Sequence, residues 1–321
     1  MITAHPLAAR HLEEAAGMFA GRYRRLSQES KCLPAEFRDG ATILTRLEEV
    51  IQNHPGAVAV ENGRVVGYLT GFTGIPAFKG SAAGVYVPVW GHCIDGTEDV
   101  NEVYSALYTE MSAQWVRARS HTHAISYFVP DDALEQLLFG LGFGLLVIDG
   151  IRALVPLGET GAADVEVRAA GVGDLADLDA MERDLAAHLS RAPCFLHAGE
   201  QSPDEVEEAF LGQGERAFVA DQNGRVIACV RGGLDRGPGC DLLNVKGSLG
   251  IDFAYTDPAA REKGIATRLL DELIGWGAAQ GMSRCVVDFE AANLIAKAFW
   301  LRHFRPICHS VIRRVDEQCS T

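Results

Sequence analysis

Hydrophobic and polar positions follow two periods along this chain, and its second half shows both most clearly. Apolar residues recur at helical spacing at Ile265, Leu269, Leu273 and Trp276, which predicts an amphipathic helix over 264–280. Short apolar runs bounded by Gly, Pro, Asn or Asp predict strands instead. The expected order is strand, helix, helix, two hairpin strands, strand, helix, strand, helix, strand, over residues 165–167, 174–189, 204–211, 217–221, 225–231, 249–255, 264–280, 283–289, 293–302 and 307–315.

The strongest turn signal in the sequence occurs twice. Asn62-Gly63 and Asn223-Gly224 each separate two apolar runs. A tight hairpin needs positive φ at both turn positions, which these residue types adopt readily. The two signals lie 161 positions apart, and the same spacing recurs in further pairs. These pairs are Phe128 with Phe289, Asp132 with Asn293, Phe143 with Phe304, and Arg152 with Arg313.

The repeat predicts two copies of one α/β unit. The expected domains are residues 1–155 and 165–321, and the expected linker is 156–164, a stretch rich in Pro, Gly and Ala with little periodicity. Two domains also fit the length of 321 residues, because a single domain usually takes about 100–200.

Charge and hydropathy narrow the possible function classes. The 29 Lys and Arg residues against 43 Asp and Glu give a formal net charge of −14, which argues against a nucleic-acid or anionic-membrane surface. The sequence has no apolar run of about 18 residues and no basic then apolar amino-terminal segment. We therefore expect no membrane span, no export signal and a cytoplasmic location.

The cysteines and histidines indicate no metal centre. The eight cysteines are scattered with no Cys-x-x-Cys pair, so we expect reduced thiols rather than a disulfide framework. His121 and His123 flank one residue, but alternation on a strand explains this pair, and no third ligand is near in sequence. No metal site is predicted.

The segment 252–270 carries the most specific chemical signal. It predicts a strand, a loop and the start of a helix, with the pattern Arg261-x-x-Gly264-x-Ala266 at the junction. The first N–H groups of a helix have no partner within it and attract anions. Small residues at Gly264 and Ala266 leave this backbone uncovered, and Arg261, Lys263 and Arg268 add positive charge. A phosphate site is the functional interpretation, and an ordinary exposed helix start is the alternative.

At this point the sequence resembles the GCN5-related N-acetyltransferase (GNAT) superfamily over most of 165–316. The resemblance lies in the order of elements, in the loop pattern above, and in the later helix Asn293-x-x-Ala296-x-x-Phe299-Trp300. It implies two tandem domains, each with a mixed, mostly antiparallel sheet flanked by helices. It also implies acetyl-CoA as cosubstrate, without a metal.

The family's cofactor contacts transfer to this sequence position by position. By resemblance, the loop and helix start would bind the pyrophosphate, the strand end would pair with the pantetheine arm, and the residue opening the later helix would bind nearby. The residues implied are Arg261, Glu262, Lys263, Gly264, Ile265, Ala266 and Thr267 for phosphate, Ala254, Tyr255 and Thr256 for pantetheine, and Asn293.

The first copy departs from this pattern. At the spacing of 161, Gly264 corresponds to Val103, whose branched side chain would cover the backbone that phosphate needs. Asn293 corresponds to Asp132, which would place a negative charge near an anionic cofactor. We expect residues 1–155 to form a degenerate domain without cofactor.

The catalytic residues are less well defined by the sequence. The family reaction needs a group, or a water chain, that takes the proton of the attacking amine. Asp252 is the first candidate, and a hydrogen-bonded or solvated strand carboxylate explains it equally well. Glu290 and Asp288 are the second candidates, for which a solvated strand end or helix cap is the favoured alternative. By the same resemblance, Trp300 occupies the position at which the family often has a tyrosine that protonates the leaving thiolate. An indole is no useful proton donor for this role. Tyr255 is then the candidate acid. Further candidates are His303, Cys308 and His309.

These features predict an N-acetyltransferase. It would move an acetyl group from acetyl-CoA to a primary amine of a small molecule or peptide by direct attack. Two alternatives stay open: a non-catalytic acyl-CoA-binding or regulatory module, and a tandem acetyltransferase of the mycothiol-synthase type. The sequence indicates neither the acceptor nor the oligomeric state.

Overall fold

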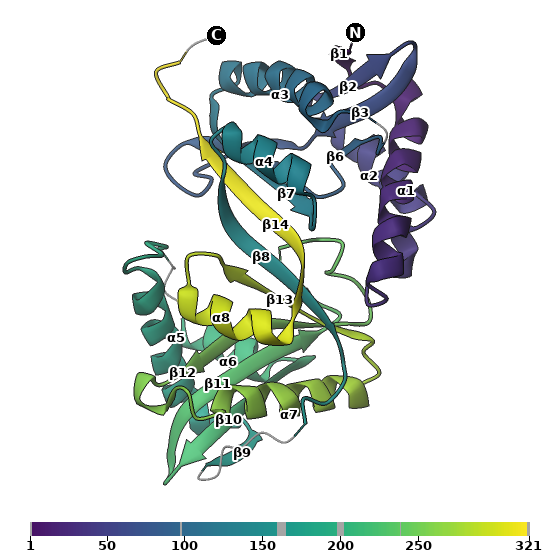
Figure 1. The fold of residues 1–321 in the computed structure, drawn as a ribbon. Coiled ribbons are helices and arrows are strands. Elements are labelled where there is room, and N and C mark those ends of the chain that lie inside the picture. Colours follow the sequence, from purple (N-terminus) through teal and green to yellow (C-terminus); the bar gives the residue numbers. More distant parts are fainter. Residues whose placement is uncertain (1, 97, 159–164, 198–201, 238, 320–321) are drawn as a thin grey trace. The chain divides into compact units, whose positions relative to one another are not determined.

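The chain folds into two compact units, shown in the computed structural model of Figure 1. One unit comprises Met1–Ile148 with Ile307–Thr321, and the other comprises Asp149–Pro306. Both units combine helices with mixed, mainly antiparallel strands, so the predicted α/β class is confirmed. The structure describes residues 2–96, 98–158, 165–197, 202–237 and 239–319.

The first unit places its helices against one small sheet and part of a larger one. β1, β2, β3 and β6 form the small sheet in that order, and β4, β5 and β7 are neighbours in the larger one. The helices are α1 (Leu12–Glu29), α2 (Ala41–Val50), α3 (Val100–Arg117) and α4 (Asp132–Gly140). The strands that begin in this unit are β1 (Thr3–Pro6), β2 (Gly56–Glu61), β3 (Arg64–Thr70), β4 (Phe72–Ile75), β5 (Ala83–Val87), β6 (His92–Ile94), β7 (Ser120–Phe128) and β8 (Gly144–Ala153).

The second half of the chain repeats this order of elements. Where the first half has β4, β5 and β6, the second has the single strand β12. The helices are α5 (Leu175–Leu189), α6 (Pro203–Leu211), α7 (Ile265–Ala279) and α8 (Leu294–His303). The strands are β9 (Glu166–Ala169), β10 (Glu215–Gln222), β11 (Arg225–Leu234), β12 (Ser248–Thr256), β13 (Arg284–Glu290) and β14 (Arg305–Arg314). The predicted repeat and the elements predicted for 165–315 are therefore present.

The last strand of each sequence half crosses from one compact unit to the other. β14 pairs antiparallel with β7 of the first unit, and β8 enters the second unit at Asp149, where β13 is its neighbour. The units therefore differ from the expected ranges 1–155 and 165–321, because the chain crosses within β8 and returns at β14. Residues 159–164 of the expected linker lie outside the described part of the chain.

β12 and β13 separate halfway along their length. Their parallel pairing ends at Ile251 and Val287, whereas β12 continues to Thr256. On its other side β12 pairs with β11, but the register skips Asp252. Such a bulge leaves one residue unpaired and bends its strand. The end of β12 therefore presents a free backbone edge on the side where β13 has moved away.

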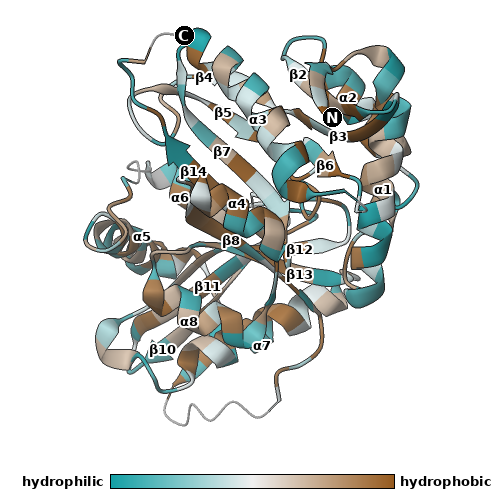
Figure 2. Cartoon of the chain, turned by 45° about the horizontal axis from the view of Figure 1, so that its top comes forward, coloured by the Kyte–Doolittle hydropathy of each residue, from teal (hydrophilic) through white to brown (hydrophobic). Residues whose placement is uncertain are grey.

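Helices cover both faces of the second sheet. α5 and α6 bury one face, where the rings of Phe210 and Phe253 lie 5.2 Å apart. α7 covers the other face, where Gly277 packs against Leu249. Its amphipathic pattern is visible as brown and teal segments in Figure 2. The positions of α7 and α5 at opposite faces bring the start of α7 and the end of α5 to the free edge of β12.

An ion pair joins the edge strand β9 to the start of α5. Arg168 donates hydrogen bonds to both carboxylate oxygens of Asp174, at 2.7 and 2.8 Å, and the N–H of Gly171 donates to the same carboxylate at 2.8 Å. The hydrogen bond from Arg168 is the main reason that the pKa of Asp174 lies below its ordinary value.

We expect Asp174→Asn to lower the free energy of unfolding by about 1–3 kcal/mol near neutral pH, because the amide lacks the negative charge and keeps only one of the two acceptor oxygens. Since the folded-state pKa of Asp174 is lowered, its stabilisation is present above the unfolded-state pKa and is lost as the pH falls through the folded value. Urea unfolding at about pH 7 and about pH 3 should show the gap between variant and wild type narrowing in acid. Asp179→Asn, in an exposed pair with Arg183, is the control and should change stability by less than about 1 kcal/mol. A gap of equal size at both pH values would contradict this assignment.

Candidate functional site

A groove of about 860 Å³ lies in the second unit, along the free edge of β12. Its walls are the end of β12, the loop before α7, the first turn of α7, one side of α8 and the end of α5. All predicted cofactor residues except Lys263 line it: Ala254, Tyr255, Thr256, Arg261, Glu262, Gly264, Ile265, Ala266, Thr267 and Asn293. Further lining residues include Leu185, His188, Cys229, Leu294, Phe299, Trp300 and Arg302.

The amino terminus of α7 opens into this groove without a side-chain cap. Gly264 is the N-cap residue, with φ 77° and ψ 0°, a conformation that glycine adopts without strain. Its lack of a side chain leaves the N–H groups of the first turn uncovered. These groups have no partner inside the helix and carry the positive end of its dipole. The helix start therefore has the chemistry of an anion site.

The three predicted cations brace the backbone around this helix start. Arg261 donates to the carbonyl oxygen of Thr256 at 3.1 Å, and Lys263 donates to that of Ala259 at 2.9 Å. Arg268 donates to the carbonyl oxygen of Val165 at 3.1 Å. The first two hydrogen bonds fix backbone beside the groove, and the third joins α7 to the residue before β9. The three side chains keep their positive charge near the helix start, but some of their N–H donors are already bound to carbonyl oxygens of the protein.

Glu262 is the unfavourable group in the loop. It has φ 63°, a left-handed conformation that is uncommon for a residue with a side chain, and it is one of the residues that line the groove. A negative charge beside the open helix start weakens the attraction of anions to it.

The opposite wall is set by the start of α8 and the end of α5. Asn293 is the N-cap of α8, and its side-chain oxygen accepts the N–H of Ala296 at 3.3 Å. The same oxygen lies 3.4 Å from Nε2 of His188 on α5. This contact ties the two helices together across the groove. His188 was not predicted from the sequence, because a histidine near a helix end carries no signal of its distant partner.

These features fit acetyl-CoA, which is an extended molecule with negatively charged phosphates. The uncapped start of α7 suits a pyrophosphate, since phosphate oxygens can accept its free N–H groups. The free edge of β12 over Ala254–Thr256 suits an amide-containing arm, which can add to a sheet edge through main-chain hydrogen bonds. The groove joins both elements, so the residues present fit the cosubstrate that the sequence predicts.

The corresponding helix start in the first unit is closed. Asp99 caps α3, and its carboxylate accepts the N–H groups of Asn101 at 2.8 Å and Glu102 at 3.3 Å. Val103, the predicted counterpart of Gly264, lies inside the helix and its N–H donates to the carbonyl of Asp99 at 3.0 Å. A carboxylate of the protein thus occupies the place at which α7 offers free N–H groups.

The strand edge of the first unit is bridged as well. His92 on β6 is buried, and its Nε2 lies 2.8 Å from the carbonyl oxygen of Ser126 on β7. Burial lowers the pKa of His92 to about 4, so the ring is neutral at physiological pH and donates this hydrogen bond from Nε2. The bridge joins the two strands that correspond to the separated ends of β12 and β13.

The candidate base Asp252 lies in a network of ion pairs. Arg231 donates to one carboxylate oxygen at 2.8 Å, and Arg236 lies 3.3 Å from the other. Arg231 also donates to Glu182 on α5 at 3.1 Å. Neither Arg231 nor Glu182 was predicted, although a lone arginine in an apolar strand is a signal that a buried carboxylate partner exists. Glu290, the second candidate, ends β13, and its carbonyl accepts the N–H of Asn293 at 3.0 Å.

The candidate acids fall in different places. Tyr255 lines the groove, and its hydroxyl donates to Asp184 at 3.3 Å. Burial, and then the negative charge of Asp184, raises the pKa of Tyr255. Trp300 is buried and lines the same groove. Of the further candidates, His303 ends α8, whereas Cys308 and His309 lie on β14 in the first unit.

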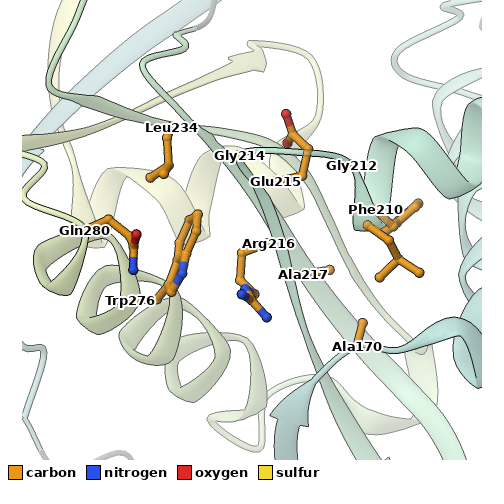
Figure 3. Close-up of a pocket in the computed structure, with 11 residues that line it drawn as sticks. Ala170, Phe210, Gly212, Gly214, Glu215, Arg216, Ala217, Leu234, Trp276 and Gln280 are labelled. Atoms are coloured by element: carbon orange, nitrogen blue, oxygen red, sulfur yellow. The ribbon is translucent and has the colours of Figure 1, made fainter.

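A second, smaller cavity of about 310 Å³ contains none of the predicted site residues (Figure 3). Its central feature is Arg216, whose guanidinium carbon lies 5.6 Å from the ring centre of Trp276. Gln280 borders the same space. Of these two cavities, the groove beside β12 is the one that contains the predicted cofactor residues.

Within the described ranges, no group of three or more His, Cys, Asp or Glu side chains is arranged to hold a metal ion. None of the helices in that part of the chain is both long and apolar enough to cross a membrane.

Residues 185–304 match the model of the acetyltransferase (GNAT) family. The matched segment contains the end of α5, β12, α7 and α8, and so includes all the walls of the groove described above. The second half of the chain is therefore a GNAT-family domain, and the predicted superfamily is confirmed.

Solved structures extend the likeness to the whole chain. A GCN5-related N-acetyltransferase from Sphaerobacter thermophilus is similar over 98% of this chain and 95% of its own, with 13% sequence identity and a TM-score of 0.55. This likeness shows the fold, and with the internal repeat it makes the arrangement a tandem one. A tandem GNAT protein from the clavulanic acid biosynthesis pathway is 14% identical over 100% of both chains, with a TM-score of 0.49. No curated protein matches the chain.

We expect Gly264→Val to reduce the affinity for acetyl-CoA at least about tenfold. A branched side chain would cover the free N–H groups and would be strained at positive φ. Isothermal titration calorimetry with acetyl-CoA measures this change. The control is Val103→Gly, inside α3 of the first unit at the position that the spacing of 161 pairs with Gly264, which should leave the affinity unchanged. Equal binding by wild type and Gly264→Val would show that the phosphate site lies elsewhere.

Proposed function

We propose that the second unit is an N-acetyltransferase that moves the acetyl group of acetyl-CoA to a primary amine of a small molecule or peptide. One observation carries the proposal: an uncapped helix start and a free strand edge border the same groove. The first suits the phosphates of a CoA thioester, and the second suits its amide-containing arm. The match to the GNAT family supports the same reaction class.

The chain's own groups would divide the work as follows. The first turn of α7 holds the phosphates, and the backbone of Ala254–Thr256 aligns the arm so that the thioester lies near the bulge at Asp252. The amine nitrogen then bonds to the thioester carbonyl carbon, the C–S bond breaks, and CoA leaves as its thiolate. The proton lost by the amine passes to a carboxylate or to water beside it. Asp252 and Glu290 remain the proposed bases.

We further propose that the first unit binds no CoA. Its corresponding helix start is capped by the Asp99 carboxylate, and His92 bridges its strand edge. An anion approaching α3 would meet both the negative charge of Asp99 and N–H groups that already have an acceptor.

A non-catalytic CoA-binding module is the second candidate function. The observation that favours it is Trp300, which is buried in the groove wall where a proton-donating tyrosine is common in the family. Both candidates use the same groove, and they differ only in turnover.

Release of free CoA, followed with a thiol reagent, distinguishes the candidates. We expect at least one amine among spermidine, tyramine, glucosamine, L-lysine and a peptide with a free amino terminus to release CoA faster than acetyl-CoA hydrolyses alone. Gly264→Val should lose this turnover, because it would bind the thioester poorly. Acetyl-CoA binding by calorimetry without turnover for any amine would favour the module. Absence of binding would exclude both functions.

A further inference from the structure

Five charged side chains form a cluster on the α5–α6 face of the second sheet. Glu182 comes from α5, Glu215 from β10, Arg231 from β11, Arg236 from the segment after β11, and Asp252 from β12. Arg236 pairs with both Glu215 and Asp252. The cluster thus contains three carboxylates and two guanidinium groups. None of its members lines the groove, but Asp252 lies two residues before the lining residue Ala254.

Arg231 is the centre of this cluster and is held on all sides. The residue is 7% exposed, its Nε donates to Asp252 at 2.8 Å, and its Nη1 donates to Glu182 at 3.1 Å. Its guanidinium carbon lies 4.4 Å from the ring centre of Phe210 and 5.5 Å from that of Phe253. Two acceptors and two aromatic rings restrict a planar guanidinium to one orientation.

The partner that Arg231 fixes is the unpaired residue of the β12 bulge. The register between β11 and β12 places Arg231 opposite Phe253 and skips Asp252. A bulge residue has no cross-strand neighbour to restrain its side chain. The orientation of the Asp252 carboxylate therefore depends on its ion pairs, and Arg231, with a side chain 9% exposed against 54% for Arg236, is the more buried of the two partners.

We infer that Arg231 is a positioning residue of the acetyl transfer, which holds the Asp252 carboxylate beside the free edge of β12. This inference rests on the proposed function, because it concerns the efficiency of that reaction. A purely stabilising role would not require the arginine to contact the bulge residue, since apolar residues often replace buried ion pairs without loss of stability. The link to Glu182 also ties α5, which forms one wall of the groove, to the same point of the sheet.

Arg231 also affects the protonation of the carboxylates around it. Burial raises the pKa of Glu182 and of Glu215, and the arginine beside each opposes that rise. Removal of Arg231 would leave Glu182, Asp252 and Glu215 with Arg236 as the one remaining cation of the cluster. One of the carboxylates would then take up a proton more readily.

The test compares Arg231→Met and Arg231→Lys with wild type, using the amine that wild type acetylates. We expect Arg231→Met to lower kcat about 100-fold, because the carboxylate loses its fixed position. The acid side of its pH–rate profile should move to higher pH, since a carboxylate that loses its cation is protonated more easily. Arg231→Lys keeps the charge without the planar fork and should lie between the two. The affinity for acetyl-CoA should stay within about threefold of wild type, because the start of α7 is untouched.

A double-mutant cycle shows whether Arg231 acts through Asp252. In an Asp252→Asn background, Arg231→Met should cost little further activity, because the side chain that it positions is already altered. Arg183→Met, at an exposed ion pair of α5, is the control and should leave kcat unchanged.

The outcomes separate the inference from the function on which it rests. If wild type acetylates no amine, the proposed function fails before any variant is made. If wild type is active and Arg231→Met has wild-type kcat, the positioning role is wrong. The same holds if both arginine variants lose activity only in proportion to the folded fraction measured by circular dichroism, with an unchanged pH profile.

Discussion

Asp252 is the bulge residue of β12 and has no pairing partner in the register with β11. This bulge determines to which face of the sheet the following side chains of β12 point. Leu249 packs against α7, whereas Phe253, four positions later, packs against α6 on the opposite face. In a regular strand these two positions would share a face, because side chains alternate with a period of two. The change of face accompanies the separation of β12 from β13, which leaves the free edge along the groove. The candidate site thus depends on a single irregularity in the sheet.

The two halves of the chain differ mainly in what occupies the amino terminus of one helix. The N–H groups of α3 are bound by the carboxylate of Asp99, and those of α7 are left open by Gly264. The physical requirement is the same in both units, since helix-start donors need acceptors. An internal carboxylate meets it permanently in α3, and an external anion can meet it in α7. A repeated fold can therefore contain one site that is closed to ligands and one that is available.

Short sequence patterns predicted much of this structure, but they did not predict which strands pair when those strands are far apart in the sequence. The spacing of 161 revealed the repeat, and the pattern around Gly264 revealed the open helix start, because both are encoded within short segments. The exchange of β8 and β14 between the units was not predictable, since an apolar strand gives the same pattern whichever sheet it joins. The bulge at Asp252 was hidden for a related reason. Leu249, Ile251 and Phe253 alternate regularly in sequence, and only pairing with β11 shows that the alternation is broken.

The chemistry of the proposed reaction places unequal demands on the acid and the base. A thiolate is a tolerable leaving group, since a thiol has a pKa of about 8.5, whereas the attacking amine must lose a proton. A site without a strong acid can therefore still work. The hydroxyl of Tyr255 donates to Asp184, and burial and then this carboxylate raise its pKa, which makes Tyr255 a weaker acid. The indole of Trp300 donates no proton at a useful pKa. The proposed reaction therefore needs a base more than it needs an acid, and Asp252, one of the carboxylates paired with Arg231, is a proposed base.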